Sequence, residues 1–98
     1  MDKEHIVGLI RDHELELRAL GVKSLGLFGS FVRDDPHQES DVDLLYEFEE
    51  GQATLKNFSG LHDLLENVLR NKVELVPRKY LSPYIGPHIL REAEPILE

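Results

Sequence analysis

Apolar residues near the start of the chain recur at three- and four-residue steps, which is the spacing of one face of an α-helix. This stripe consists of Ile6, Ile10, His13, Leu17 and Leu20. Asp2 is placed to cap such a helix, and Glu4 lies in its first turn, where a negative charge is favourable. Gly21 is placed to end it. We therefore predict an amphipathic helix between Asp2 and Gly21.

Two strands are expected next. Val22 to Phe28 is rich in apolar residues and too short for a helix, so it reads as a strand. Gly29 and Ser30 form a turn after it, residues 31–33 a short helical turn, and residues 34–40 a polar loop. In the second strand, Asp41 to Phe48, alternate side chains point to opposite faces. One face holds Val42, Leu44, Tyr46 and Phe48, and the other holds Asp41, Asp43, Leu45 and Glu47.

The second half of the chain begins with a turn around Gly51. A helix follows, starting between Thr54 and Ser59, with its apolar stripe at Leu61, Leu64, Leu65, Val68 and Leu69. We expect Asn71 to take the left-handed position that ends this helix. Val73 to Val76 is predicted to be a third strand, which Pro77 stops.

The C-terminal pattern is less regular. Ser82 and Pro83 have the chemistry of a helix cap and first helical position, but Gly86 and Pro87 interrupt. We expect a helical turn over Pro87 to Ala93, and a tail or short edge strand over Pro95 to Glu98. The order α-β-β-α-β-α then predicts one α+β (mixed α/β) domain over residues 1–98.

Composition narrows the function. The chain has no cysteine, which excludes thiolate zinc sites, and no apolar run long enough to span a bilayer or serve as a leader. We therefore expect a cytoplasmic protein. The net charge of −8 argues against direct nucleic-acid binding, which relies on Lys and Arg. It either steers a basic protein partner or only keeps the domain soluble.

The candidate chemistry lies around the first turn. Gly29 and Ser30 are followed, after ten residues, by Asp41 and Asp43. Backbone N–H groups at such a turn favour an anion, and glycine lets a phosphate come close. Asp41 and Asp43 lie on one strand face, where two carboxylates suit divalent metal ions. Separately, each motif also fits an ordinary turn or a solvated strand; together they predict a nucleoside triphosphate site with magnesium.

Two further charged residues belong to the hypothesis. Glu74 lies between Val73 and Leu75, where it either completes the metal site and takes a proton from a hydroxyl, or faces solvent. Arg33 lies one turn after Ser30, where it pairs either with phosphate or with the nearby acids at positions 34, 35 and 41. The structural ion pair is the favoured role for Arg33.

These residues resemble the minimal nucleotidyltransferase (MNT) family of the DNA polymerase beta-like nucleotidyltransferase superfamily. The match consists of Phe28-Gly29-Ser30, then Ser40-Asp41-Val42-Asp43-Leu44, then Val73-Glu74-Leu75-Val76. The resemblance implies a small mixed sheet flanked by helices. It also implies that Gly29 and Ser30 hold the triphosphate, that Asp41 and Asp43 bind two magnesium ions, and that the acid at Glu74 helps activate the acceptor hydroxyl.

The resemblance also implies a partner. Family members of this size are often encoded beside a HEPN-domain ribonuclease toxin, and some are antitoxins that transfer AMP from ATP to a toxin tyrosine. On that basis we expect a hetero-oligomer with such a toxin. Two departures from the family pattern are visible: Glu74 stands where Asp is usual, and Asp34 stands where a small residue is common.

Two alternatives remain open. The first is a non-catalytic antitoxin that neutralises its partner by occlusion. The second is a nucleotidyltransferase that acts on small molecules, but such enzymes usually have an additional helical domain for the acceptor.

Overall fold

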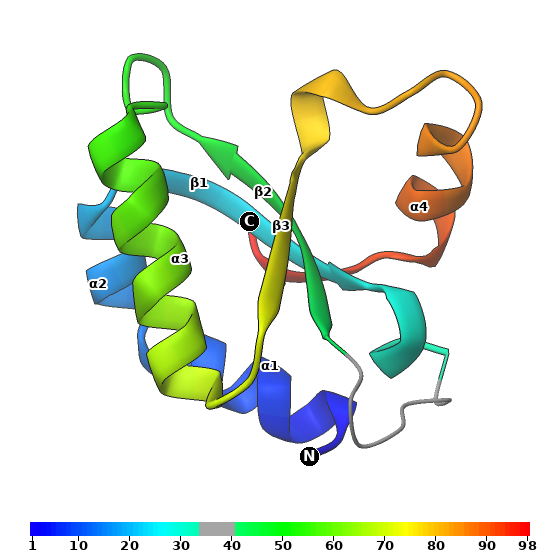
Figure 1. Ribbon diagram of the computed structural model, residues 1–98, viewed down its shortest axis with the longest axis horizontal. Coiled ribbons are helices and arrows are strands. Elements are labelled where there is room, and N and C mark those ends of the chain that lie inside the picture. Colours follow the sequence, from blue (N-terminus) through cyan, green and yellow to red (C-terminus); the bar gives the residue numbers. More distant parts are fainter. Residues whose placement is uncertain (34–40) are drawn as a thin grey trace.

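The centre of the molecule is a four-stranded sheet with the order β3-β2-β1-β4 in a computed structural model (Figure 1). The strands are β1 (Val22–Phe28), β2 (Val42–Phe48), β3 (Val73–Pro77) and β4 (Glu94–Leu97). The structure describes residues 1–33 and 41–98, so the predicted loop over residues 34–40 lies outside the described residues.

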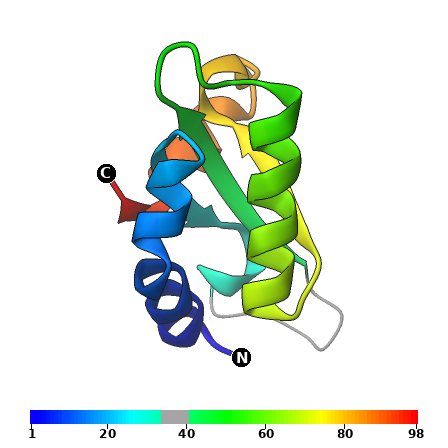
Figure 2. The same ribbon diagram turned by 90° about the vertical axis from the view of Figure 1, so that its left-hand side faces the viewer.

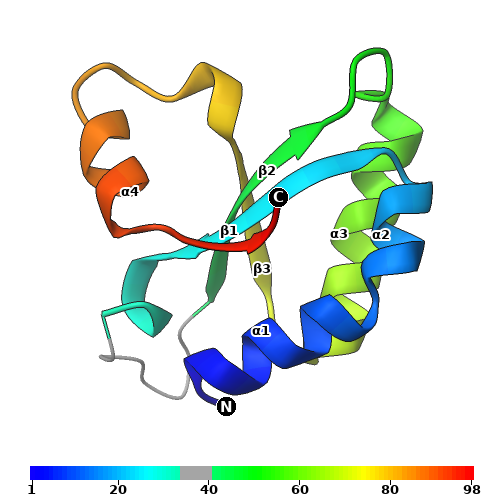
Figure 3. The ribbon, with the colours of Figure 1, turned by 180° about the vertical axis from the view of Figure 1, so that it is seen from behind.

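The sheet is mixed, as the sequence predicts. β1 pairs antiparallel with both β2 and β4, and β2 pairs parallel with β3. The expectation of a C-terminal edge strand is confirmed, because β4 runs back along the outer side of β1 (Figure 3). Pro77 is the last residue of β3 rather than a residue beyond it. It can belong to a strand because β3 is at the edge of the sheet, where a missing N–H costs no ladder hydrogen bond.

The N-terminal helical segment is broken, where a continuous helix was expected. α1 (Lys3–Asp12) and α2 (Glu14–Ala19) meet at His13. The His13 backbone leaves helical geometry at φ −108° and ψ 21°, and its ring nitrogen Nδ1 lies 2.8 Å from the Leu9 carbonyl oxygen. The cap at Asp2 is confirmed, since its carboxylate accepts a hydrogen bond from the His5 N–H.

The long helix α3 (Leu55–Leu69) has the predicted stripe. Leu61, Leu65 and Leu69 are fully buried. Thr54 caps the helix through its side-chain oxygen, which accepts from the Asn57 N–H at 3.1 Å. The prediction for the other end is wrong by one residue. Arg70, and not Asn71, takes the left-handed conformation, with φ 51°, and its N–H donates a helical hydrogen bond to the Glu66 carbonyl at 2.8 Å.

The segment before the last helix also differs from expectation. Ser82 and Pro83 do not begin a helix. The Ser82 carbonyl instead accepts from the Gly86 N–H at 2.7 Å, and its hydroxyl accepts from the Tyr84 N–H, which closes a turn. A 3-10 turn, η2 (Arg78–Tyr80), precedes this turn, and α4 (Gly86–Glu92) follows it.

The two faces of the sheet are covered differently. α1, α2 and α3 lie on one face, and α4 lies on the other side (Figure 2). The core is on the side of the three helices, where the alternation of β2 buries Val42 and Leu44 completely. Tyr46 packs against Phe58 of α3 at 5.6 Å between ring centroids. The opposite face is therefore the one on which Asp43 lies. Among the described residues, no helix is long and apolar enough to cross a membrane.

Candidate active site

The predicted phosphate-binding turn lies where β1 ends. Gly29 opens a 3-10 turn, η1 (Gly29–Phe31), with a φ of +82°, which an L side chain rarely adopts. A Cβ atom at this position would overlap the carboxylate of Asp43. Ser30 is the half-buried second residue of the turn, and the buried Phe31 fixes it to the core. Glycine thus allows both the bend and the close approach of an acidic side chain.

The predicted acids come together from neighbouring strands. Asp43 lies opposite Phe28 in the β1–β2 pair and opposite Glu74 in the β2–β3 pair. Asp41 directly precedes β2 and is exposed. Glu74 is also exposed, as strand alternation allows, and yet it is beside Asp43. The two roles considered for Glu74 are therefore compatible: it faces solvent and borders the site.

Asp43 has an unusual protonation equilibrium. Its pKa is raised from 3.8 to about 6, chiefly by burial and then by a hydrogen bond with the Glu74 side chain and by the charges of Glu74 and Asp41. The positive charge of Arg33 acts the other way. Like charges so close together destabilise the ionised state unless a cation lies between them. This is the electrostatic environment in which a bound cation is most favourable.

The acids do not form a complete metal cage. Across residues 1–33 and 41–98, no three His, Asp or Glu side chains are arranged to hold a metal ion. The paired oxygens of Asp43 and Glu74 nevertheless fit magnesium, which is usually held by one or two carboxylates together with substrate phosphates. The assignment of Asp41, Asp43 and Glu74 as metal ligands stays a prediction.

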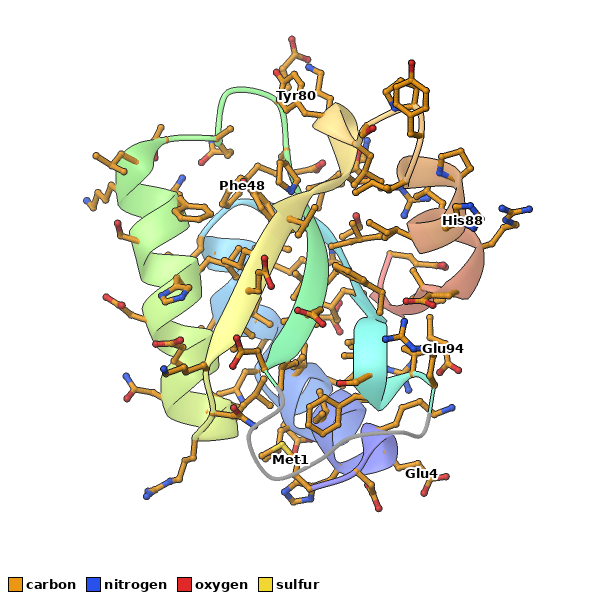
Figure 4. The ribbon with its side chains drawn as sticks, turned by 45° about the vertical axis from the view of Figure 1, so that its right-hand side comes forward. Met1, Glu4, Phe48, Tyr80, His88 and Glu94 are labelled. Atoms are coloured by element: carbon orange, nitrogen blue, oxygen red, sulfur yellow. The ribbon has the colours of Figure 1, made fainter. Side chains whose placement is uncertain are left out.

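A pocket of about 420 Å³ opens beside the acids. One wall consists of sheet residues, with Asp43 and Glu74 among them, and the other consists of Tyr80, Leu81, Ser82, Ile85 and Ile89. Tyr80 and His88 point outward from this C-terminal segment (Figure 4). The pocket volume lies within the range of small-molecule sites, about 300–1,000 Å³. The pocket is therefore large enough for a ligand beside the acids.

Arg33 forms an ion pair, which was the favoured prediction, but with a residue that sequence reasoning missed. Its Nη1 lies 3.0 and 3.1 Å from the two carboxylate oxygens of Glu92. The same carboxylate accepts a hydrogen bond from the Gly29 N–H at 2.9 Å. Of the acids expected to pair with Arg33, positions 34 and 35 lie outside the described residues. Glu92 is 59 residues from Arg33, and no local pattern connects them.

Comparisons with known proteins identify the family of this chain. The sequence model of a family described as "Nucleotidyltransferase domain" matches residues 10–95. The protein adenylyltransferase MntA of Thermococcus cleftensis is 41% identical over 91% of this chain and 90% of its own length. A solved structure described as a "putative minimal nucleotidyltransferase" is 32% identical, with a TM-score of 0.71 over 95% of this chain and 94% of its own.

One of the structural matches is a complex. An MNT antitoxin bound to the tri-AMPylated HEPN toxin of Shewanella oneidensis has a TM-score of 0.62. The match covers 92% of this chain and 71% of that chain. At 17% identity, this likeness concerns the fold.

Proposed function

This chain belongs to the nucleotidyltransferase domain family, and from that premise we propose that it is a magnesium-dependent antitoxin that transfers AMP from ATP to a tyrosine of a HEPN-domain toxin. The observation on which the proposal rests is the contact between the Gly29 turn and Asp43, with Glu74 on the next strand. This contact joins the backbone turn that we propose binds phosphate to the carboxylates of Asp43 and Glu74 within one small site.

The relatives support the chemistry and the partner. MntA of Thermococcus cleftensis is named a protein adenylyltransferase, and it aligns with this chain over most of both sequences. The complex from Shewanella oneidensis contains an AMPylated HEPN toxin.

The proposal assigns a role to each residue of the site. Gly29 and Ser30 hold the triphosphate through the turn at the end of β1. The tyrosine oxygen attacks the α-phosphorus, the bond to the bridging oxygen breaks, and pyrophosphate leaves. Glu74, which is exposed at the pocket, accepts the hydroxyl proton. When magnesium is bound at Asp41, Asp43 and Glu74, it neutralises charge that develops on the phosphates.

The second candidate function is an antitoxin that acts by occlusion alone. Two observations favour it: no three acids of the described chain form a ready metal site, and Glu74 replaces the usual Asp. In this case the toxin would be silenced by binding, with no change in its covalent structure. The two candidates differ in whether the carboxylates of Asp41 and Asp43 are needed.

A labelling experiment tests the proposal. The chain is incubated with α-labelled ATP, magnesium and a HEPN-domain toxin from the same genome, and label on each protein is measured. We expect label on a toxin tyrosine, lost in the double variant Asp41→Asn, Asp43→Asn. Glu47→Gln is the matched control, because Glu47 is on the same strand as Asp43 and its carboxylate accepts from Ser24. If the double variant still neutralises the toxin fully, without label, the occlusion function is correct.

A further inference from the structure

Glu92 occupies a special position in the ladder between β1 and β4. These strands are antiparallel, and Leu27 lies opposite Glu94. Gly29 lies two residues after Leu27, just past the end of β1, and Glu92, the last residue of α4, lies two residues before Glu94. The Glu92 side chain therefore accepts the hydrogen bond that a backbone carbonyl would accept if the strand continued. Figure 3 shows the path of the chain from α4 into β4 beside β1.

One carboxylate serves two groups of the predicted phosphate-binding site. Oε1 of Glu92 accepts from the Gly29 N–H at 2.9 Å and from Arg33 Nη1 at 3.0 Å, and Oε2 accepts from the same Nη1 at 3.1 Å. The Glu92 side chain is 28% exposed, and that of Arg33 is 58% exposed. The acid is thus the more buried partner, and the guanidinium extends from it towards solvent.

We infer that Glu92 is a positioning residue for the nucleotide: it fixes the Gly29 turn and the direction of Arg33, so that both meet the triphosphate. This inference rests on the proposed function. A guanidinium has five N–H donors, and Glu92 contacts only Nη1, so donors on Nε and Nη2 are left to other acceptors. In the described part of the chain, Glu92 accepts from Gly29 and Arg33 and from neither Ser30 nor Phe31.

The opposite role would be competition, in which Glu92 occupies the place of a phosphate and must leave before ATP binds. The ladder geometry argues against it. The Gly29 N–H points towards the segment that leads into β4, because it donates to Glu92, two residues before that strand begins. Glu92 therefore satisfies the N–H of Gly29, and the bend at Gly29 leaves Ser30 as the residue that a phosphate at the turn would contact. The two roles predict opposite changes in nucleotide affinity when the carboxylate is removed.

The experiment measures the affinity of the full chain for a non-hydrolysable ATP analogue with magnesium, and the KM values for ATP and for the toxin. For Glu92→Ala, we expect the Kd of the analogue and the KM for ATP to rise about tenfold, which corresponds to losing one charge-assisted hydrogen bond of about 1.4 kcal/mol. The KM for the toxin should change less than twofold. Glu92→Gln keeps an acceptor for the Gly29 N–H, so it should restore part of the affinity.

Glu94→Gln is the matched control. Glu94 lies two residues after Glu92, and its carboxylate pairs with the Lys3 ammonium group at 2.9 Å. We expect a change in Kd of less than twofold in this variant, and circular dichroism confirms that each variant is folded. Tighter binding in Glu92→Ala, or equal effects of the substitutions at 92 and 94, overturns the inference. If the wild type binds the analogue but transfers nothing, the proposed function fails, while the binding data still decide the role of Glu92. If the wild type does not bind it, both fail.

Discussion

Asp43 should make the metal-free protein less stable at neutral pH than it is in acid. Its pKa is about 6 in the folded chain and 3.8 as an ordinary value. Between these values the folded state binds more protons than the unfolded state. The contribution of this group to stability is therefore complete below pH 4, and it is lost as the pH rises through 6.

The size of the effect follows from the same values. The rise in the pKa of Asp43 from 3.8 to about 6 corresponds to about 3 kcal/mol of folding free energy. The carboxylate is only half-buried, so solvent screening reduces this figure to about 1–2 kcal/mol. Asp43→Asn removes the charge at nearly constant shape, and its amide can donate to Glu74. At pH 7.5 without divalent cations, we expect this variant to be more stable than the wild type by that amount, or about 5–10 °C in Tm.

Thermal unfolding in a chelating buffer at pH 7.5 and at pH 4 measures the difference. Most of the gain should disappear at pH 4, where the wild-type carboxyl group is protonated in the folded state. Glu47→Gln controls for removing a charge from the same strand, and it should change Tm little at either pH. If Asp43→Asn has the same Tm as the wild type at pH 7.5, or a lower one, the electrostatic description of the site is wrong.

Three further substitutions test other parts of the site and the fold. Gly29→Ala places a Cβ against the Asp43 carboxylate in a left-handed conformation, so transfer of label should fall at least about 100-fold and Tm should fall as well. Glu74→Gln should keep affinity for the ATP analogue and lower the transfer rate about 10²–10⁴-fold, measured at saturating ATP. Arg70→Gly relieves the left-handed conformation after α3, so urea unfolding should show a gain of about 0.5–1 kcal/mol with unchanged transfer.

The part of the site that the sequence predicts is local in the chain. Gly29 and Ser30 follow an apolar run, and Asp41 and Asp43 alternate with buried residues, so their roles can be read from neighbours. The bounds of β1 and the apolar stripe of α3 are predictable for the same reason. Both predictions depend on a periodicity within a single element, and that periodicity arises because one face of the element is buried.

What sequence reasoning missed depends on contacts between distant segments. Glu92 meets Gly29 only because β4 pairs with β1, and a four-residue strand gives little periodic signal. The break at His13 depends on a hydrogen bond to a carbonyl, which the apolar stripe does not reveal. Ser82 has the chemistry of a helix cap but closes a turn instead, since the choice between these two uses depends on the packing of the following residues.

Three features of the candidate site lie together at one end of the sheet. They are the left-handed backbone at Gly29, the acids gathered around Asp43, and the carboxylate of Glu92 at the end of the β1 ladder. The repulsion among the acids around Asp43 costs free energy in the absence of a ligand, and a cation with a bound triphosphate would relieve it. Glu92 alone among them holds the turn in place without any ligand. If Glu92 positions the turn, nucleotide affinity falls when its carboxylate is removed, and the site is prepared for its ligand. If Glu92 competes with the phosphate, nucleotide affinity rises, and the site is closed by its own chain.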